Sequence, residues 1–372
     1  MRILHLRSPK GIFGAENFII SLAKKQQESG DKVFVAILND CSNNKNTELL
    51  KKIKESGLCL IYLECKRFDV RIISKIRKII IKEKIDIIHS HGYKSNFYSF
   101  FSSLWLKSVL RIATCHTWYS DNIKMKFYEF LDKILLKKFY RIVCVAPELV
   151  EEVKKNGIPE EKVSFILNGV DIFQNEMTKE ASLVRKSLNL ASEDYVIGTI
   201  ARLSKGKGHV HLINILPKLL KDFPNIKYLI VGDGVLREDL SKEAKGLGVQ
   251  DKIIFAGTRN DIIDILSELN LFVLPSLKEG LPIALLEAMA GKKTIVVSDV
   301  GAINMVIKDD YNGKLVIPGD EESLEKAIRQ LLKNKQKATY LAENAFKDVV
   351  ANFSSSAMKK KYDKVYRGEN AN

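Results

Sequence analysis

Residues 275–288 read PSLKEGLPIALLEA and form a loop between two apolar segments. The four residues before them, Leu271 to Leu274, have the length and composition of a buried strand. The segment Ala284 to Ala290 consists of strong helix formers, and Pro282 suits the first turn of a helix. The stretch therefore predicts a strand, a tight loop and a helix. The start of that helix would present backbone N–H groups and the positive end of a dipole, which favours phosphate binding.

Two carboxylates lie in this predicted phosphate site. Glu279 is in the loop, and Glu287 follows inside the predicted helix. A carboxylate repels phosphate, but it is a good acceptor for the hydroxyl groups of a sugar or ribose. We therefore expect a ligand with both kinds of group, such as a nucleotide-sugar diphosphate. The alternative for Glu287 is a solvent-facing place on the polar side of the helix.

Strands and helices alternate over most of the 372 residues. At about 150 residues per domain, this length favours two domains. The alternation is typical of α/β proteins with a doubly wound parallel sheet. Residues 172–194 are polar and interrupt the alternation, so we expect a first domain over 1–171, a linker over 172–194 and a second domain over 195–352.

The last residues, 353–372, have apolar side chains at helical spacing. We expect a helix over Ser355 to Arg367 that packs back on the first domain.

The net charge of +15 is unevenly distributed. Residues 1–170 carry 30 Lys and Arg against 18 Asp and Glu, whereas the remaining residues carry 30 against 27. A basic first half suggests an acidic partner, such as phosphates, an anionic membrane surface or an acidic polymer. A solvated lysine-rich surface is the alternative.

The five cysteines are scattered and lack metal-ligand spacing, so we expect reduced thiols. The first residues have too short an apolar stretch for a signal peptide, and no run approaches the ~18 apolar residues that span a bilayer. We therefore expect a cytoplasmic protein, with peripheral contact at the inner face of the membrane still open.

Two cations occupy a loop in the second half of the chain. Arg202 and Lys207 lie in residues 201–208, ARLSKGKG, between a predicted strand and a predicted helix. Ligands of open α/β sheets bind outside the carboxyl ends of the strands. Two cations among glycines that allow close backbone approach suit a diphosphate, and a plain surface loop is the alternative. The loop is not a Walker A loop, because the chain has no Gly-x-x-x-x-Gly-Lys-Ser/Thr sequence.

Together these motifs resemble family 4 of the retaining glycosyltransferases. The most specific match is Glu-Gly-Leu-Pro-(x)4-Glu-Ala, with seven residues between Glu279 and Glu287. The other matching segments are NGVD at 168–171, RLSKGKG at 202–208, VGDG at 231–234, and Asn312-Gly313 with Pro318. The resemblance covers nearly the whole chain. It implies the GT-B fold, in which two Rossmann-like, doubly wound parallel-sheet domains face a deep cleft and the C-terminal helix crosses back to the first domain.

The resemblance implies roles in donor binding. Arg202 and Lys207 would hold the donor diphosphate and neutralise charge on the leaving nucleotide. Glu287 would bind the ribose hydroxyls, and Glu279 would contact the donor sugar. Backbone amides at the end of the loop would hold sugar hydroxyls or phosphate; these residues are Gly280, Leu281, Pro282 and Ile283.

The resemblance also implies roles in the first domain. His116 matches the histidine that reaches the sugar, and with Glu279, Arg202 and Lys207 it would complete the catalytic group. Gly14 matches the glycine loop under the diphosphate, although the family often has two adjacent glycines where this chain has Phe13-Gly14. Glu16 is a candidate for acceptor contact, and His91 lies on the expected acceptor side. His89, two residues earlier, we expect to be structural.

The implied reaction moves a hexose-type sugar from a nucleotide-diphosphate sugar to a hydroxyl acceptor with retention of anomeric configuration. Such reactions serve the synthesis of bacterial cell-surface polysaccharide, lipopolysaccharide or glycolipid. The favoured route is front-face attack, in which the departing phosphate helps to deprotonate the acceptor and no side chain is the nucleophile. No Asp-x-Asp motif occurs at a plausible place, so we expect no metal and no cofactor.

The acceptor has to be inferred from the basic first domain. Basic and apolar residues are interleaved over 71–84 and 124–139, which fits a lipid-linked or saccharide acceptor and an anionic membrane surface. Ordinary helices that bury one apolar face are the alternative. Two other functions stay open, an epimerase-like GT-B enzyme and a non-catalytic protein that binds phosphate or nucleic acid. The chain has no nucleic-acid recognition motif, so we expect no nucleic-acid partner.

Overall fold

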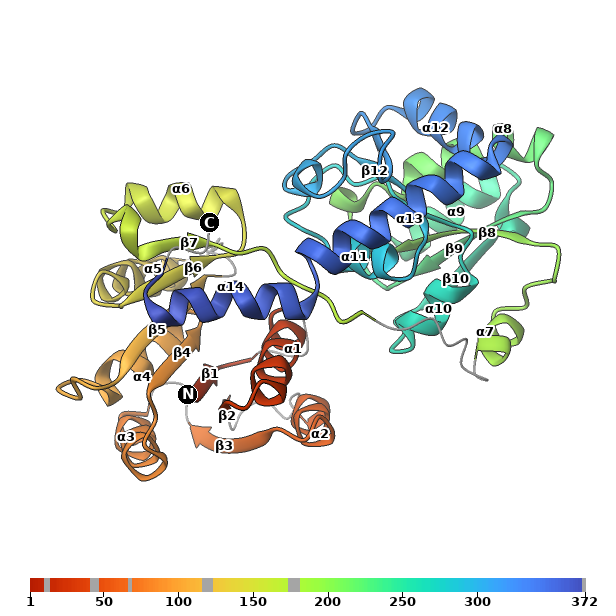
Figure 1. Cartoon of the computed structure of the whole chain (residues 1–372). Coiled ribbons are helices and arrows are strands. Elements are labelled where there is room, and N and C mark those ends of the chain that lie inside the picture. The colour runs from red at the N-terminus through yellow and green to blue at the C-terminus, as the bar shows by residue number, and fades with distance from the viewer. Residues whose placement is uncertain (10–13, 41–46, 66–68, 116–122, 173–180, 370–372) are drawn as a thin grey trace. The chain divides into compact units, whose positions relative to one another are not determined.

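The computed structural model describes residues 1–372 except 10–13, 41–46, 66–68, 116–122, 173–180 and 370–372 (Figure 1). The described chain forms two compact units. The first comprises residues 1–169 and 355–372, and the second comprises residues 170–354. Each unit has a parallel sheet with helices on both faces. The predicted pair of doubly wound, Rossmann-like domains is therefore confirmed.

Within the described residues, the sheet of the first unit has the strand order β3-β2-β1-β4-β5-β6-β7, and each adjacent pair is parallel. The strands are β1 (Arg2–Arg7), β2 (Lys32–Asp40), β3 (Cys59–Cys65), β4 (Ile87–His91), β5 (Leu110–Cys115), β6 (Arg141–Cys144) and β7 (Val163–Phe165). The chain moves outward from β1 to β3 and then returns to β4. The topological switch point therefore lies between the carboxyl ends of β1 and β4.

Helices cover both faces of this sheet, and the strand sequences show why. In β1, Ile3 packs in a cluster with α1 (Gly14–Glu28), whereas Leu4 and Leu6 pack in a cluster with α3 (Arg71–Glu83). Successive side chains of a strand point to opposite faces, so a sheet covered on both faces needs apolar residues at nearly every position. Further helices of this layered unit are α2 (Thr47–Glu55), α4 (Tyr93–Ser102), α5 (Ile123–Leu136) and α6 (Pro147–Lys155).

The second unit has the described strand order β10-β9-β8-β11-β12-β13, again with parallel neighbours. Its strands are β8 (Tyr195–Ile200), β9 (Ile226–Val231), β10 (Ile253–Gly257), β11 (Leu271–Leu274), β12 (Thr294–Ser298) and β13 (Lys314–Val316). Its helices are α7 (Ala181–Ser187), α8 (His209–Asp222), α9 (Arg237–Gly246), α10 (Ile262–Glu268), α11 (Ile283–Ala290), α12 (Glu321–Lys333) and α13 (Lys335–Asn352). The switch point of this sheet lies between β8 and β11.

The last helix, α14 (Ser355–Arg367), belongs to the first unit (Figure 1). Its apolar side chains are buried in the same cluster as those of α1. The hydroxyl groups of Ser21 and Ser355 lie 2.6 Å apart, which ties the start of α14 to α1. The helix thus returns to the first domain, as its apolar spacing predicts.

The unit boundaries differ from the predicted ones. The second unit begins at Val170 and ends at Ser354, and the predicted linker, 172–194, contains α7. This helix packs on α10, and Arg185 Nη1 lies 2.9 Å from Glu268 Oε2. Residues 181–187 are therefore part of the second unit, because a tertiary ion pair and helix packing hold a segment whose local composition is that of a linker.

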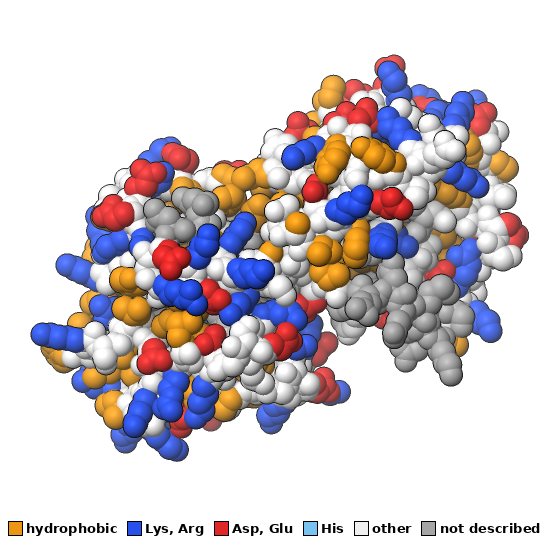
Figure 2. Space-filling model, in the orientation of Figure 1, with side chains coloured by type: hydrophobic (Ala, Val, Ile, Leu, Met, Phe, Trp, Pro, Cys, Tyr) orange, Lys and Arg blue, Asp and Glu red, His pale blue; other side chains and the backbone are white. Residues whose placement is uncertain are grey.

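Basic side chains are spread over the visible face of the first unit (Figure 2). On α3, three isoleucines face the core while the solvent side carries Arg71, Lys75, Lys78 and Lys82. On α5, Phe130 and Ile134 are 60% and 47% exposed.

Within the part of the chain that the structure describes, no helix is both long and apolar enough to cross a membrane.

Candidate active site

The stretch at 275–288 adopts the predicted strand, loop and helix. β11 ends at Leu274, and α11 begins at Ile283 after Pro282, whose backbone is extended. Proline has no N–H group. The amides that this turn offers are therefore those of Gly280, Leu281 and Ile283, so Pro282 drops out of the predicted set of amide donors.

Lys207 and Glu279 form a close ion pair. Lys207 Nζ lies 2.6 Å from each carboxylate oxygen of Glu279, and Ser276 Oγ donates to Oε1 at 2.8 Å. The carboxylate side chain is 5% exposed and the lysine 26%. A largely buried charge needs such a partner, so each side chain orients the other. Lys207, which was predicted to bind phosphate, and Glu279, which was predicted to bind the sugar, are thus directly paired.

The loop that carries Arg202 and Lys207 packs directly on the loop 275–282. The backbone N–H groups of Leu277 and Lys278 donate to the carbonyl oxygen of Gly206 at 2.9 and 3.2 Å. Gly208 has φ of +65°, and a Cβ atom there would overlap the carbonyl oxygen of Pro275. Only glycine combines this backbone conformation with so close an approach.

A third loop, after β12, supports Glu279. Gly301 has φ of +57°, and a Cβ atom there would overlap the carbonyl oxygen of Glu279. The N–H group of Ala302 donates to the carbonyl of Gly280 at 3.1 Å. Loops that follow β8, β11 and β12 thus meet at the carboxyl edge of the sheet, where ligands of doubly wound folds bind.

The two remaining donor-side candidates lie next to this junction. Arg202 is exposed, and its carbonyl oxygen lies 3.2 Å from Nε2 of the buried His209. Glu287 is half-buried on α11, one turn after Ile283. The structure therefore places Arg202, Lys207 and Glu279 on adjoining loops, with Glu287 on the helix that follows.

In the first unit, Glu16 and His91 are joined through Arg7. Arg7 Nε and Nη2 each lie 2.8 Å from Glu16 Oε1, and Arg7 Nη1 donates to the carbonyl oxygen of His91 at 2.8 Å. Glu16 and His91 are each 1% exposed, whereas the Arg7 side chain is 19% exposed. The guanidinium of Arg7 is therefore the most accessible of the three groups at the β1–β4 switch point.

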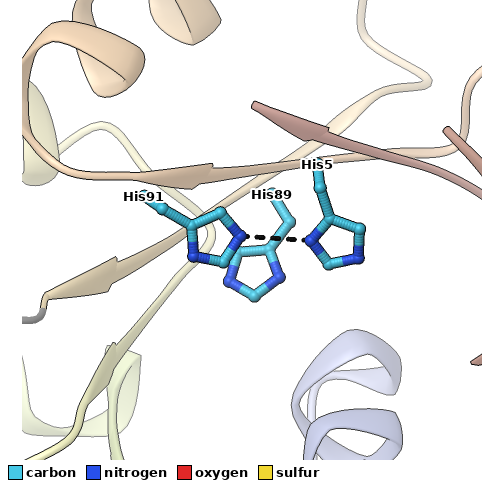
Figure 3. A group of neighbouring side chains, drawn as sticks. All are labelled: His5, His89 and His91. Atoms are coloured by element: carbon cyan, nitrogen blue, oxygen red, sulfur yellow. Dashed lines mark hydrogen bonds between the residues drawn. The ribbon is translucent and has the colours of Figure 1, made fainter. Parts of the chain in front are cut away.

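Three buried histidines lie side by side behind this point (Figure 3). His5 Nδ1 lies 3.1 Å from His91 Nε2, and one nitrogen of each of His5, His89 and His91 lies within 4.8 Å of the others. Both nitrogens of His89 are engaged by hydroxyl groups, those of Tyr366 and Thr114, each at 2.7 Å. A metal ion would have to displace one of these hydrogen bonds, so the three rings are engaged by hydrogen bonds and are not an open set of ligands.

The hydrogen bond between His91 and His5 continues to the side-chain amide of Gln26, and this amide sets the direction of both hydrogen bonds. Gln26 Oε1 lies 2.8 Å from His5 Nε2, and an amide oxygen only accepts, so His5 Nε2 carries the hydrogen. Burial lowers the pKa of His5 to about 4, although the hydrogen bond with Gln26 raises it. The ring is therefore neutral near pH 7, and its Nδ1 accepts from His91 Nε2. Gln26 also donates to Tyr366 Oη at 3.0 Å, which links α1 to α14.

Two of the predicted site residues, Gly14 and His116, lie at or within segments outside the described residues. Gly14 is the first residue of α1, and the loop residues 10–13 before it lie outside the described residues. His116 also lies outside the described residues.

Sequence reasoning overlooked three residues of these sites, although each had a signal. Ser276 stands inside the stretch 275–288, and His209 directly follows the segment 202–208. Arg7 is the last residue of β1, and the carboxyl end of a strand is where a ligand-binding residue of an α/β sheet belongs.

Comparison with known proteins agrees with this geometry. The family model of glycosyl transferases group 1 matches residues 181–348, and that of glycosyltransferase family 4 matches residues 12–173. An uncharacterized glycosyltransferase of Methanocaldococcus jannaschii is 30% identical over 304 residues, covering 77% of this chain and 76% of that protein.

Two further relatives cover more of the chain. The N,N'-diacetylbacillosaminyl-diphospho-undecaprenol alpha-1,3-N-acetylgalactosaminyltransferase of Campylobacter jejuni is 27% identical and covers 94% of both chains. The crystal structure of Anabaena HepE in complex with UDP has a TM-score of 0.81 at 20% identity, covering 99% of this chain and 100% of that one. From these matches and the two parallel-sheet units, we conclude that the chain belongs to the GT-B-fold glycosyltransferases of the family 4 type.

Proposed function

We propose that the protein is a retaining hexosyltransferase that uses a nucleotide-diphosphate sugar as donor and a lipid-linked saccharide as acceptor. The observation that carries the proposal is the Lys207–Glu279 ion pair, held by three loops at the switch point of the second sheet. It joins a phosphate-binding cation to a carboxylate that can accept sugar hydroxyls, as transfer from such a donor requires.

On the donor side, Arg202 and Lys207 would neutralise the charge that grows on the diphosphate. Lys207 lies in the turn before α8, whose N-terminal dipole adds to the positive potential. Glu279 would hold Lys207 and a sugar hydroxyl, and Glu287 would accept from the ribose. His116 would contact the sugar, and Gly14 would lie below the diphosphate. Because HepE was crystallised with UDP, UDP-sugars are the first donors to test.

The reaction needs no nucleophilic side chain. The bond between the anomeric carbon and the diphosphate oxygen breaks, and the acceptor oxygen attacks the same face of the sugar. The proton of the acceptor hydroxyl passes to the departing phosphate, so charge and atoms balance. Arg202 and Lys207 would supply the electrostatic stabilisation that a metal ion provides in other transferases, so we propose metal-independent transfer.

On the acceptor side, the name of the Campylobacter relative specifies a saccharide linked to diphospho-undecaprenol. A diphosphate-linked lipid suits a first unit with a strong excess of Lys and Arg. Glu16 and His91, joined by Arg7, would line the acceptor side. We also propose that the protein works at the cytoplasmic face of the membrane, because α5 exposes Phe130 and Ile134 in a basic domain.

One assay tests the central proposal. UDP-, GDP- and ADP-sugars are supplied with undecaprenyl-diphosphate-linked saccharides, and the anomeric configuration of the product is determined by NMR. We expect an axial linkage from an axial donor and full activity in EDTA. An inverted product would contradict retention, and loss of activity in EDTA would contradict metal independence. Conversion of donor to a free epimer without any acceptor would favour the epimerase-like alternative.

A further inference from the structure

A buried line of polar groups runs from the backbone of Arg202 to the backbone of β11. His209 Nε2 lies 3.2 Å from the Arg202 carbonyl oxygen, and His209 Nδ1 lies 3.3 Å from Tyr228 Oη. The Tyr228 hydroxyl lies 3.0 Å from Thr199 Oγ1, which in turn lies 2.7 Å from the carbonyl oxygen of Val273. His209, Tyr228 and Thr199 are each at most 2% exposed.

This line lacks one hydrogen when His209 is neutral. A carbonyl oxygen only accepts, so His209 Nε2 must carry a hydrogen toward Arg202, and Thr199 must give its hydrogen to Val273. Tyr228 then has a single hydrogen for two neighbours, Thr199 Oγ1 and His209 Nδ1. The contact between His209 Nδ1 and Tyr228 Oη, at 3.3 Å, is the one left without a hydrogen when Tyr228 donates to Thr199. A proton on Nδ1 would turn every contact into a hydrogen bond.

Burial disfavours protonation of His209 Nδ1. It lowers the pKa of His209 to about 4, the hydrogen bond to the Arg202 carbonyl raises it, and the Lys207 ammonium lowers it. His209 is also the first residue of α8, where the helix dipole disfavours a positive charge. Burial, the Lys207 charge and the helix dipole thus all disfavour protonation of His209. A bound anion offsets the last two of these effects.

We propose that His209 takes up a proton when the diphosphate of a nucleotide sugar binds at Arg202 and Lys207, and that the charged ring then locks the Arg202 backbone to β11. His209 is thus a positioning residue, because its ring acts through the Arg202 carbonyl and the strand that leads into loop 275–282. A charge-assisted hydrogen bond holds that carbonyl more firmly than a neutral one. The inference rests on the proposed function, because it needs the donor diphosphate at these two cations.

Among the described residues, Lys207 and Tyr228 are charged or titratable groups that act on His209. Lys207 comes from the loop before α8, and Tyr228 comes from β9. Glu279, on the loop after β11, already accepts from Lys207 and so offsets part of its charge. His211, two residues along α8, interacts instead with Glu321 of α12, at 3.1 Å. His211 therefore offers a matched control on the same helix.

The test measures proton uptake directly. UDP-glucose is titrated into the full-length protein by calorimetry in pairs of buffers with different ionisation enthalpies, between about pH 5 and about pH 8. The phosphates of this diester do not titrate in that range. We expect binding to take up a fraction of a proton, at most about one per donor, and the Kd to fall as the pH is lowered. The sign follows because the complex binds protons more tightly than the free protein.

Three variants separate the line from other titrating groups. His209→Gln supplies an amide that donates to Arg202 and accepts from Tyr228, so we expect donor binding without proton uptake. Tyr228→Phe keeps the histidine but removes the contact that needs the extra hydrogen, so uptake is again lost. Thr199→Val frees the Tyr228 hydrogen for His209 Nδ1 and has the same effect, which provides a second variant should Tyr228→Phe fold poorly. His211→Gln keeps the uptake of the wild type.

The outcomes distinguish this inference from the proposed function. Donor binding by the wild type without proton uptake at any pH overturns the inference, as does uptake that persists in His209→Gln. An unchanged Kd for UDP-, GDP- and ADP-glucose in the double variant Arg202→Ala/Lys207→Ala would instead show that the proposed donor site is wrong. Uptake lost in His209→Gln, Tyr228→Phe and Thr199→Val but kept in His211→Gln supports the inference.

Discussion

Lys207 Nζ lies 2.6 Å from both carboxylate oxygens of Glu279, although the two residues are 72 positions apart in the chain. Glu279 also accepts from Ser276, so this carboxylate has at least three hydrogen-bonding contacts. The two side chains hold each other in place, so we expect a change to one residue to displace the other.

The first prediction concerns this pair. In Glu279→Gln, a neutral amide replaces the charge that orients Lys207, and the group proposed to hold the donor sugar is weakened. We expect kcat/KM for transfer to fall about 100-fold or more, as for loss of a preorganised electrostatic contact. Glu287→Gln provides the comparison, because a ribose contact should raise the donor KM and leave kcat nearly unchanged. Full activity of Glu279→Gln would remove this residue from the mechanism.

The second prediction concerns the packing of the loops. In Gly208→Ala, the new Cβ would overlap the carbonyl oxygen of Pro275 at a backbone φ of +65°. We expect a loss of about 1–3 kcal/mol in unfolding free energy and a strong fall in activity, because Lys207 shifts with the loop. Gly206→Ala is the matched control, since a Cβ there would lie 4.0 Å from Lys278. Thermal denaturation and donor kinetics measure both; equal effects of the two substitutions would contradict the role of Gly208.

The third prediction concerns pH and stability. Burial lowers the pKa of His5 to about 4 from an ordinary value of 6.5, so between these values the unfolded chain binds a proton that the folded protein does not. Stability therefore falls as the pH decreases from 6.5 through 4, by up to about 3 kcal/mol from His5. Urea denaturation as a function of pH measures this slope.

We expect His5→Gln to reduce that slope by about one proton, because its side chain does not titrate. An identical slope in the wild type and His5→Gln would mean that His5 is not held neutral by burial.

The fourth prediction concerns the membrane. The exposed Phe130 and Ile134 stand on α5 of the basic first unit, so we expect binding to vesicles that contain anionic lipid at low salt and release at high salt. The double variant Phe130→Ser/Ile134→Ser should weaken binding at low salt without changing donor affinity. Vesicles of neutral lipid are the control. Recovery of the wild type in the soluble fraction at every salt concentration would rule out this contact.

Much of the fold could be predicted because its signals are local. The apolar run at Leu271–Leu274, the turn residues after it and the helix formers of α11 specify strand, loop and helix without distant contacts. Short strands were not predicted, because β7 and β13 each have only three residues, too few to show an alternation of apolar side chains. The helix α7 was missed because Arg185 and Glu268, which hold it in place, are distant in sequence.

The sequence by itself determined the two parallel sheets, the loops at their carboxyl ends and the residue types in those loops, because periodicity and turn chemistry are properties of neighbouring residues. Only the tertiary structure decided which of these residues meet. The parallel order of β8 and β11 brings Lys207 to Glu279, and the packing of α14 on α1 brings Tyr366 to Gln26 and His89. The line from Arg202 through His209 to Val273 likewise depends on three adjacent strands, because its hydrogens can be counted only once the heavy atoms are in place.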